Sequence, residues 1–308
     1  MSLDPVVEVL LGQLAEAGGL PLNEMSPSEG RAMYQAMNAD AVKQALTEVT
    51  DTDAAGVPVR IYRPSAQDNL ACIVFYHGGG WVIGDLETHD GPCRRLANAT
   101  GAVVVAVDYR LAPEHPFPAA QDDCYTATCW VADNAAALNI DASKIAVAGD
   151  SAGGNLAAVV SLRARDENGP KIAHQLLIYP ATDAAMNTQS YSDNADGYML
   201  TRESMAWFWQ NYLGTDYLGT DNQTNPLASP LMAESLANLP PATIITAEFD
   251  PLRDEGEAYG EKLKAAGNDA EIVREDGLIH GFISLVDGVP AADKAVTSFS
   301  GKLKIALG

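Results

Sequence analysis

The chain has 308 residues, of which 47% are hydrophobic, so it is long enough for one large domain or one domain with an inserted subdomain. It carries 41 acidic against 19 basic residues, and its formal net charge is -22. We find no cluster of basic residues, which argues against nucleic-acid binding and against an anionic membrane surface. The acid excess suits either adaptation to salt or an ordinary acidic soluble protein, and composition alone leaves both open.

The N-terminal segment, MSLDPVVEVLLGQLAEAGG, has no basic start, and no apolar run approaches 20 residues. Neither a secretion signal nor a membrane span is therefore expected, and we predict a cytoplasmic protein. The cysteines form no CxxC pair, which argues against a metal site; they are Cys72, Cys93, Cys124 and Cys129.

The first part of the chain combines helical and strand-like patterns. Apolar residues recur every three to four positions over 3–18, and helical spacing returns over 26–46. The segment 57–64, VPVRIYRP, then alternates in the manner of a half-buried strand.

From residue 71 onward, short apolar runs alternate with helical segments. The predicted strands cover 71–77, 102–108, 144–150, 174–180, 242–250 and 270–276. The predicted helices cover 90–100, 119–138, 152–166, 254–266 and 291–306. Continuous apolar strands separated by helices are typical of a parallel sheet covered on both faces, so the sequence predicts an α/β fold.

A long interruption, roughly 183–235, separates two of these predicted strands. It is rich in Asn, Asp, Tyr and Trp, and it contains an expected amphipathic helix at 202–213. A connection of this length is usually a lid or a cap.

The segment GDSAG, residues 149–153, lies where a predicted strand turns into an alanine-rich helix. It matches the G-x-S-x-G nucleophile elbow, in which small neighbours allow a strained serine backbone. The N-terminus of the following helix favours developing negative charge. Because Gly-rich turns are common, assigning Ser151 as a nucleophile requires companions elsewhere in the chain.

The first companion is HGGGW, residues 77–81, directly after the strand 71–77. Three consecutive glycines leave backbone N–H groups unshielded, and those donors can face an oxyanion. A flexible loop or a phosphate-binding turn is the alternative, but the latter needs a Lys-Ser/Thr pair or GxGxxG spacing, and neither is present.

An acid and a base follow later in the chain. Asp250 ends the strand 242–250, and His280 comes soon after the strand 270–276. Such an Asp is often only a helix N-cap, and Asp254 is a rival acid. The order Ser151, Asp250, His280 is nevertheless that of the α/β-hydrolase triad. The other histidines weighed fit less well, because they precede the serine or begin a strand: His89, His115 and His174.

Five motifs in this order resemble the bacterial hormone-sensitive-lipase-type esterases, also called family IV. They are HGGGW (77–81), DYRLAPEHPFPAA (108–120), GDSAGGNLA (149–157), DPLRDEG (250–256) and HGF (280–282). The resemblance covers nearly the whole chain, and the serine motif has the GDSAG form of one subgroup. It implies an α/β-hydrolase fold, with a mostly parallel eight-stranded sheet, flanking helices and a helical cap.

Carried over by position, the resemblance implies that Ser151 is the nucleophile, His280 the general base and Asp250 the acid that orients it. It implies that the oxyanion hole consists of the amides of Gly79, Gly80 and Ala152. It further implies a homodimer through the strand 270–276. The implied division has cap segments at 1–45 and 183–235 and core segments at 46–182 and 236–308.

The activity implied is hydrolysis of short-chain acyl esters by a serine carboxylesterase, without metal or organic cofactor. Amidase or lactonase activity of the same triad is an alternative, as is a non-catalytic ligand-binding protein of the same fold. The prolines of 108–120 fix a loop that we expect to support the oxyanion segment. Several aromatic residues either wall the substrate pocket or belong to the core: Trp81, Tyr198, Trp207, Phe208 and Trp209.

Overall fold

A single eight-stranded sheet organises residues 2–308, which are the residues that the computed structural model describes. Its spatial order is β1-β2-β4-β3-β5-β6-β7-β8, antiparallel at the β1–β2 and β2–β4 pairs and parallel elsewhere. The strands are β1 (Glu48–Ala54), β2 (Val57–Arg63), β3 (Leu70–Tyr76), β4 (Val103–Val107), β5 (Ile140–Asp150), β6 (His174–Ile178), β7 (Ala242–Phe249) and β8 (Ala270–Ile279).

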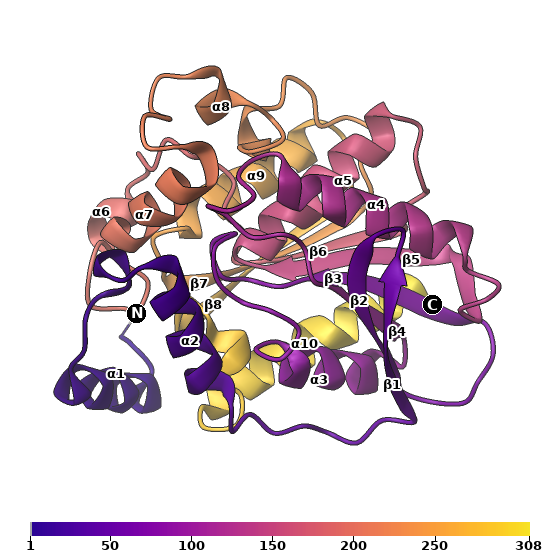
Figure 1. Ribbon diagram of the computed structural model, residues 1–308, viewed down its shortest axis with the longest axis horizontal. Coiled ribbons are helices and arrows are strands. Elements are labelled where there is room, and N and C mark those ends of the chain that lie inside the picture. Colours follow the sequence, from indigo (N-terminus) through magenta and orange to yellow (C-terminus); the bar gives the residue numbers. More distant parts are fainter. Residues whose placement is uncertain (1) are drawn as a thin grey trace.

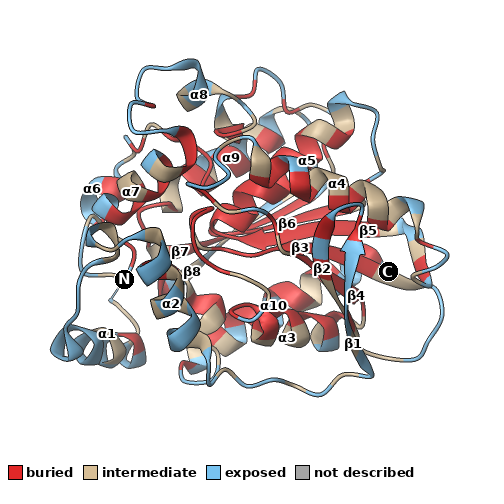
Figure 2. Cartoon of the chain, viewed as in Figure 1, coloured by how far each residue is buried: buried red, intermediate tan, exposed pale blue. Residues whose placement is uncertain are grey.

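Helices cover both faces of the sheet, as the apolar strands predict. Every residue of β4 and β6 is buried, so neither strand has a solvent-facing side on which polar residues would alternate. The two helices on one face are α3 (Asp90–Thr100) and α10 (Pro290–Leu307) (Figure 1). The helices on the opposite face are α4 (Ala119–Asp133), α5 (Ala152–Asp166) and α9 (Arg253–Ala265) (Figure 1). The sheet between them forms the buried centre in Figure 2.

Two segments far apart in the sequence lie outside these layers. The first holds α1 (Pro5–Ala17), η1 (Leu22–Glu24) and α2 (Pro27–Asn38). The second holds α6 (Ser190–Asp193), α7 (Arg202–Leu213), α8 (Asp221–Thr224) and η2 (Pro230–Met232). The two segments meet where η1 contacts α7. Within residues 2–308, no helix has both the length and the apolar character that a membrane crossing requires.

The chief differences from the sequence-based expectations are two helix ends and one strand. The helix expected over 26–46 ends at Asn38, because tertiary bonds take up the backbone beyond it: Val42 N donates to Asp287, and Gln44 O accepts from Arg94. The helix expected over 119–138 ends at Asp133. The strand β1 was not predicted at all, since its sequence EVTDTDA is polar and largely exposed. It is stabilised as the hairpin partner of β2.

Two glycines inside helices offer a matched test of packing against the sheet. A Cβ on Gly260 of α9 would lie 2.5 Å from Ile272 Cγ1, whereas a Cβ on Gly301 of α10 would meet nothing within 4 Å. Gly260→Ala is expected to lower the free energy of unfolding by about 1–3 kcal/mol through overpacking. Gly301→Ala should raise it by about 0.5–1 kcal/mol, because alanine favours the helix. Urea unfolding measures both changes. Equal effects of the two substitutions would contradict the close packing of Gly260 against Ile272.

Candidate active site

A sharp turn between β5 and α5 places Ser151 at the carboxyl edge of the sheet. Its backbone has φ 58° and ψ -119°, a conformation that side chains other than glycine rarely adopt. A Cβ on Gly149 would overlap Gly153 O, and a Cβ on Gly153 would overlap Tyr76 O. Both flanking glycines are therefore required by the close approach of backbones, as the elbow motif predicts.

His280 lies between Ser151 and Asp250 within hydrogen-bonding distance of both. Its Nε2 is 2.9 Å from Ser151 Oγ, and its Nδ1 is 2.8 Å from Asp250 Oδ2. All three residues are buried. A carboxylate only accepts hydrogen bonds, so Nδ1 carries the proton and Nε2 is free to accept one from the serine hydroxyl. The structure thus brings together the three residues that chain order singled out.

The carboxylate of Asp250 is held in place by its own turn. Its second oxygen accepts from Leu252 N at 2.9 Å, and Asn194 Nδ2 donates to its backbone carbonyl at 3.1 Å. The rival Asp254 faces elsewhere, because its oxygens accept from Ser190 N and from Arg253 Nε, each at 2.8 Å. The motif order selected Asp250 over Asp254, and the fold places only Asp250 against the imidazole.

The glycine-rich loop after β3 runs beside the serine because β3 and β5 are neighbours in the sheet. Gly79 and Gly80 have φ of 114° and 57°. Within residues 2–308 neither of their N–H groups has a hydrogen-bond acceptor. Ala152 is the first residue of α5, where an N–H has no acceptor inside the helix. The resemblance implies that the amides of these three residues are the oxyanion donors.

The segment 108–120 supports this loop, as expected. The Tyr109 hydroxyl donates to His77 O at 2.8 Å, and the two rings stack with centroids 4.2 Å apart. Burial, together with charge repulsion from His89, lowers the pKa of His77 to about 4, so this imidazole is neutral at physiological pH.

The predicted pocket aromatics occupy different environments. Trp81 is fully buried and stacks on Tyr212 with centroids 4.4 Å apart, so its ring has no surface to offer a substrate and belongs to the core. Trp209 is fully buried against the other side of that cluster. Phe208 lies directly against Gly80, where an added Cβ would overlap its ring. Tyr198 and Trp207 are half-buried.

Motif matching did not assign a function to several residues near the triad. The Tyr179 ring lies 4.6 Å from that of His280, and its φ is 36°. Asp150, in the middle of the serine motif, accepts from Gly78 N at 2.9 Å. His89 also lies next to Asp150. Asp150 belongs to the GDSAG motif, but none of the five sequence motifs contains Tyr179 or His89, and the partners of all three residues are distant in the sequence.

We compared the chain with known families and proteins. A family model described as alpha/beta hydrolase fold matches residues 73–284, and the chain belongs to this family. The match confirms the resemblance to the hormone-sensitive-lipase-type esterases.

Several similar proteins are named as esterases. The chain is 45% identical over 260 residues to Esterase LipI of Mycobacterium tuberculosis, covering 83% of this chain and 80% of LipI. It is 47% identical over 253 residues to Carboxylesterase NlhH of the same species, covering 82% and 79%. Among solved structures, the hyperthermophilic esterase of Pyrobaculum calidifontis aligns with a TM-score of 0.94 at 44% identity, covering 100% of both chains. The protein is a carboxylic ester hydrolase.

The geometry separates the two candidate acids, and substitution tests that separation. Asp250→Asn is expected to lower kcat about 10⁴-fold, because an amide no longer holds the imidazole in the required tautomer. Asp254→Asn should lower kcat less than about 10-fold, since its partners lie outside the triad. Steady-state kinetics on one ester measures both variants, and the reverse ranking would show that Asp254 rather than Asp250 orients the imidazole.

Proposed function

We propose that the protein hydrolyses short-chain acyl esters through an acyl-enzyme formed on Ser151, with His280 as general base and Asp250 as its orienting acid. The observation that carries this proposal is the unbroken chain from Ser151 Oγ through both imidazole nitrogens to Asp250 Oδ2, at 2.9 and 2.8 Å. Free backbone amides beside the serine complete the arrangement that acyl transfer needs.

In the first half of the reaction, Ser151 Oγ attacks the ester carbonyl carbon while its proton passes to His280 Nε2. The carbonyl oxygen becomes an oxyanion and accepts hydrogen bonds from the amides of Gly79, Gly80 and Ala152. Asp250 stabilises the imidazolium through Nδ1–H. The tetrahedral intermediate then collapses, the bond to the leaving oxygen breaks, and the Nε2 proton passes to the departing alcohol.

In the second half, a water molecule takes the place of the alcohol. His280 Nε2 removes its proton as the water oxygen attacks the acyl carbon, and the same amides receive the second oxyanion. Collapse of this intermediate breaks the acyl–Oγ bond, returns the proton to Ser151 and releases the carboxylic acid. The chemistry needs no metal or organic cofactor.

The preference for short acyl groups rests on the segments that we propose as the cap, 1–45 and 183–235. Phe208 of α7 packs directly on Gly80, so the second segment lies against the proposed oxyanion loop. Aromatic side chains packed this close leave little length for an acyl chain. We assign Phe208, Trp207 and Tyr198 to the pocket and its rim. The placement of His280 against Ser151 favours catalysis over a non-catalytic binding role.

One set of measurements tests this function. A panel of 4-nitrophenyl esters from acetate to laurate should give the highest kcat/KM between acetyl and hexanoyl. Ser151→Ala should lose turnover by about 10⁶-fold while keeping its fold, because the nucleophile is gone. An alkyl phosphonate should label the native chain once, at Ser151. Near-native rates in Ser151→Ala would refute the mechanism, and a preference for laurate would refute the chain-length assignment.

We also propose a homodimer formed through β8. This strand ends the sheet, so within residues 2–308 one of its edges has no partner strand, and such an edge can pair with a second copy. Sedimentation equilibrium should then give twice the 32.5 kDa of a single chain. A single-chain mass at micromolar concentration would contradict the dimer. The cytoplasmic location stays a prediction.

A further inference from the structure

A buried histidine outside the triad connects the two backbone segments that carry the proposed oxyanion donors. His89 immediately precedes α3 and is 1% exposed. Its Nε2 lies 3.3 Å from Asp150 Oδ1 and 3.2 Å from Gly78 N. Asp150 immediately precedes the serine, and Gly78 immediately precedes Gly79, so one imidazole lies at the junction of the elbow and the glycine loop.

The direction of the hydrogen bonds follows from the groups present. A carboxylate oxygen only accepts, so His89 Nε2 carries the proton in its 3.3 Å contact with Asp150 Oδ1, and the Gly78 N–H donates to the same oxygen at 2.9 Å. A protonated Nε2 cannot accept from Gly78 N, so the 3.2 Å contact between those two nitrogens does not count as a hydrogen bond. On the other side of the same peptide, His77 Nδ1 lies 2.7 Å from Gly78 O. A Cβ on Gly78 would overlap the Asp150 carboxylate. The Gly78 peptide thus packs against the Asp150 carboxylate, and a shift of that carboxylate would move the glycine-rich loop.

Asp150 needs a partner because it is buried, with 4% of its surface exposed. Burial alone would raise the pKa of Asp150, but the charge and hydrogen bond of His89, with smaller effects of His280 and the Gly78 N–H, hold it below its usual value. A buried carboxylate that loses its donor must either take up a proton or move toward water. Either response would weaken the hydrogen bond that Gly78 N–H donates to Asp150 Oδ1.

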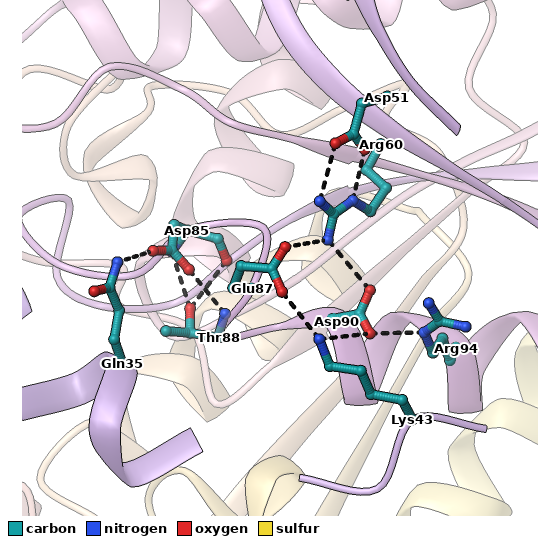
Figure 3. Close-up of polar contacts among 9 residues, drawn as sticks. All are labelled: Gln35, Lys43, Asp51, Arg60, Asp85, Glu87, Thr88, Asp90 and Arg94. Carbon is teal, nitrogen blue, oxygen red and sulfur yellow. Dashed lines mark hydrogen bonds and ion pairs between the residues drawn. The ribbon is translucent and has the colours of Figure 1, made fainter. Parts of the chain in front are cut away.

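The second ring nitrogen of His89, Nδ1, is held by the preceding loop. Nδ1 lies 3.0 Å from Thr88 Oγ1, and Thr88 N donates to Asp85 Oδ1 at 2.8 Å. Figure 3 shows that Gln35 of α2 in turn donates to Asp85.

Ion pairs hold the rest of this loop. Glu87 pairs with Arg60 at 2.8 Å and with Lys43 at 2.9 Å, and Asp90 pairs with Arg94 at 2.6 Å (Figure 3). The loop that carries His89 is therefore held by contacts that do not involve the elbow. These contacts fix the position of the imidazole next to Asp150.

We infer that His89 is a positioning residue for the oxyanion hole: through Asp150 it holds Gly78, and thereby the amides of Gly79 and Gly80, where the developing oxyanion forms. This inference rests on the proposed function. His89 does not touch the reacting atoms. Its effect is confined to the transition state, because donors that are displaced by a fraction of an ångström stabilise the oxyanion less while substrate binding is unchanged.

Two substitutions separate the hydrogen bond from the volume of the ring. His89→Leu fills similar space without a donor, and we expect kcat on 4-nitrophenyl butyrate to fall about 10- to 100-fold with KM within about twofold. His89→Gln can place an amide N–H near the Nε2 position, so we expect kcat within about fivefold of the native value. The second-order rate of inactivation by an alkyl phosphonate should fall in parallel with kcat, because the phosphonyl oxygen uses the same amides.

A neighbouring variant serves as the control for stability. Arg95→Leu breaks the ion pairs of α3 with Asp287 and Asp293, which do not hold His89, so its melting temperature should fall while kcat stays native. If His89→Leu does not fold, His89→Gln against the shorter His89→Asn makes the same comparison, since only the longer amide reaches Asp150.

The outcomes are distinct. Native kcat in His89→Leu, equal losses in the Leu and Gln variants, or a matching loss in Arg95→Leu would each overturn the inference. Failure of the phosphonate to label Ser151 in the native protein would instead overturn the proposed function itself.

Discussion

The site depends on the close approach of three backbone segments at the end of β5. Ser151 adopts a positive φ, and the carbonyl of Tyr76 in the next strand lies where a Cβ on Gly153 would be. This contact allows the first turn of α5 to lie against the end of β3. Since the glycine loop continues from β3, the same contact brings its amides beside the serine. The proposed nucleophile and the proposed oxyanion donors are thus positioned by one packing constraint.

Two buried carboxylates near this junction have opposite protonation tendencies. Asp150 has an imidazole donor, and its pKa lies below the usual value. Glu255 is buried beside Asp183 and Asp250, and burial raises its pKa well above the usual value although the backbone amides of Thr182 and Asp183 donate to it. The two pKa shifts differ because the neighbours differ. The imidazole of His89 stabilises the ionised form of Asp150, whereas the carboxylates near Glu255 add to the penalty of burying its charge.

The outer segments are attached to the core through the loop that carries the proposed oxyanion donors. Arg31 of α2 donates to Val82 O at 2.8 Å and to Ala112 O at 2.9 Å, and it pairs with Glu114. From the other segment, Phe208 packs on Gly80. Two stretches separated by more than 150 residues therefore converge on the same loop. A substrate pocket between these two stretches would therefore be held by the same loop that carries the proposed oxyanion donors.

The amino-acid sequence by itself determined the alternation of apolar strands and helices, the elbow and the order of serine, acid and base. These are local properties, since burial periodicity and the steric need for glycine act over a few residues. The tertiary structure alone decided that Trp81 belongs to the core and that His89 meets Asp150, whereas it places against His280 the acid that the sequence motifs had already selected, Asp250. It also decided that the helix after residue 26 ends at Asn38 and that the polar segment 48–54 forms a strand. Each of these depends on a partner distant in the sequence, and local patterns carry no information about which distant group will satisfy a buried charge or a free backbone amide.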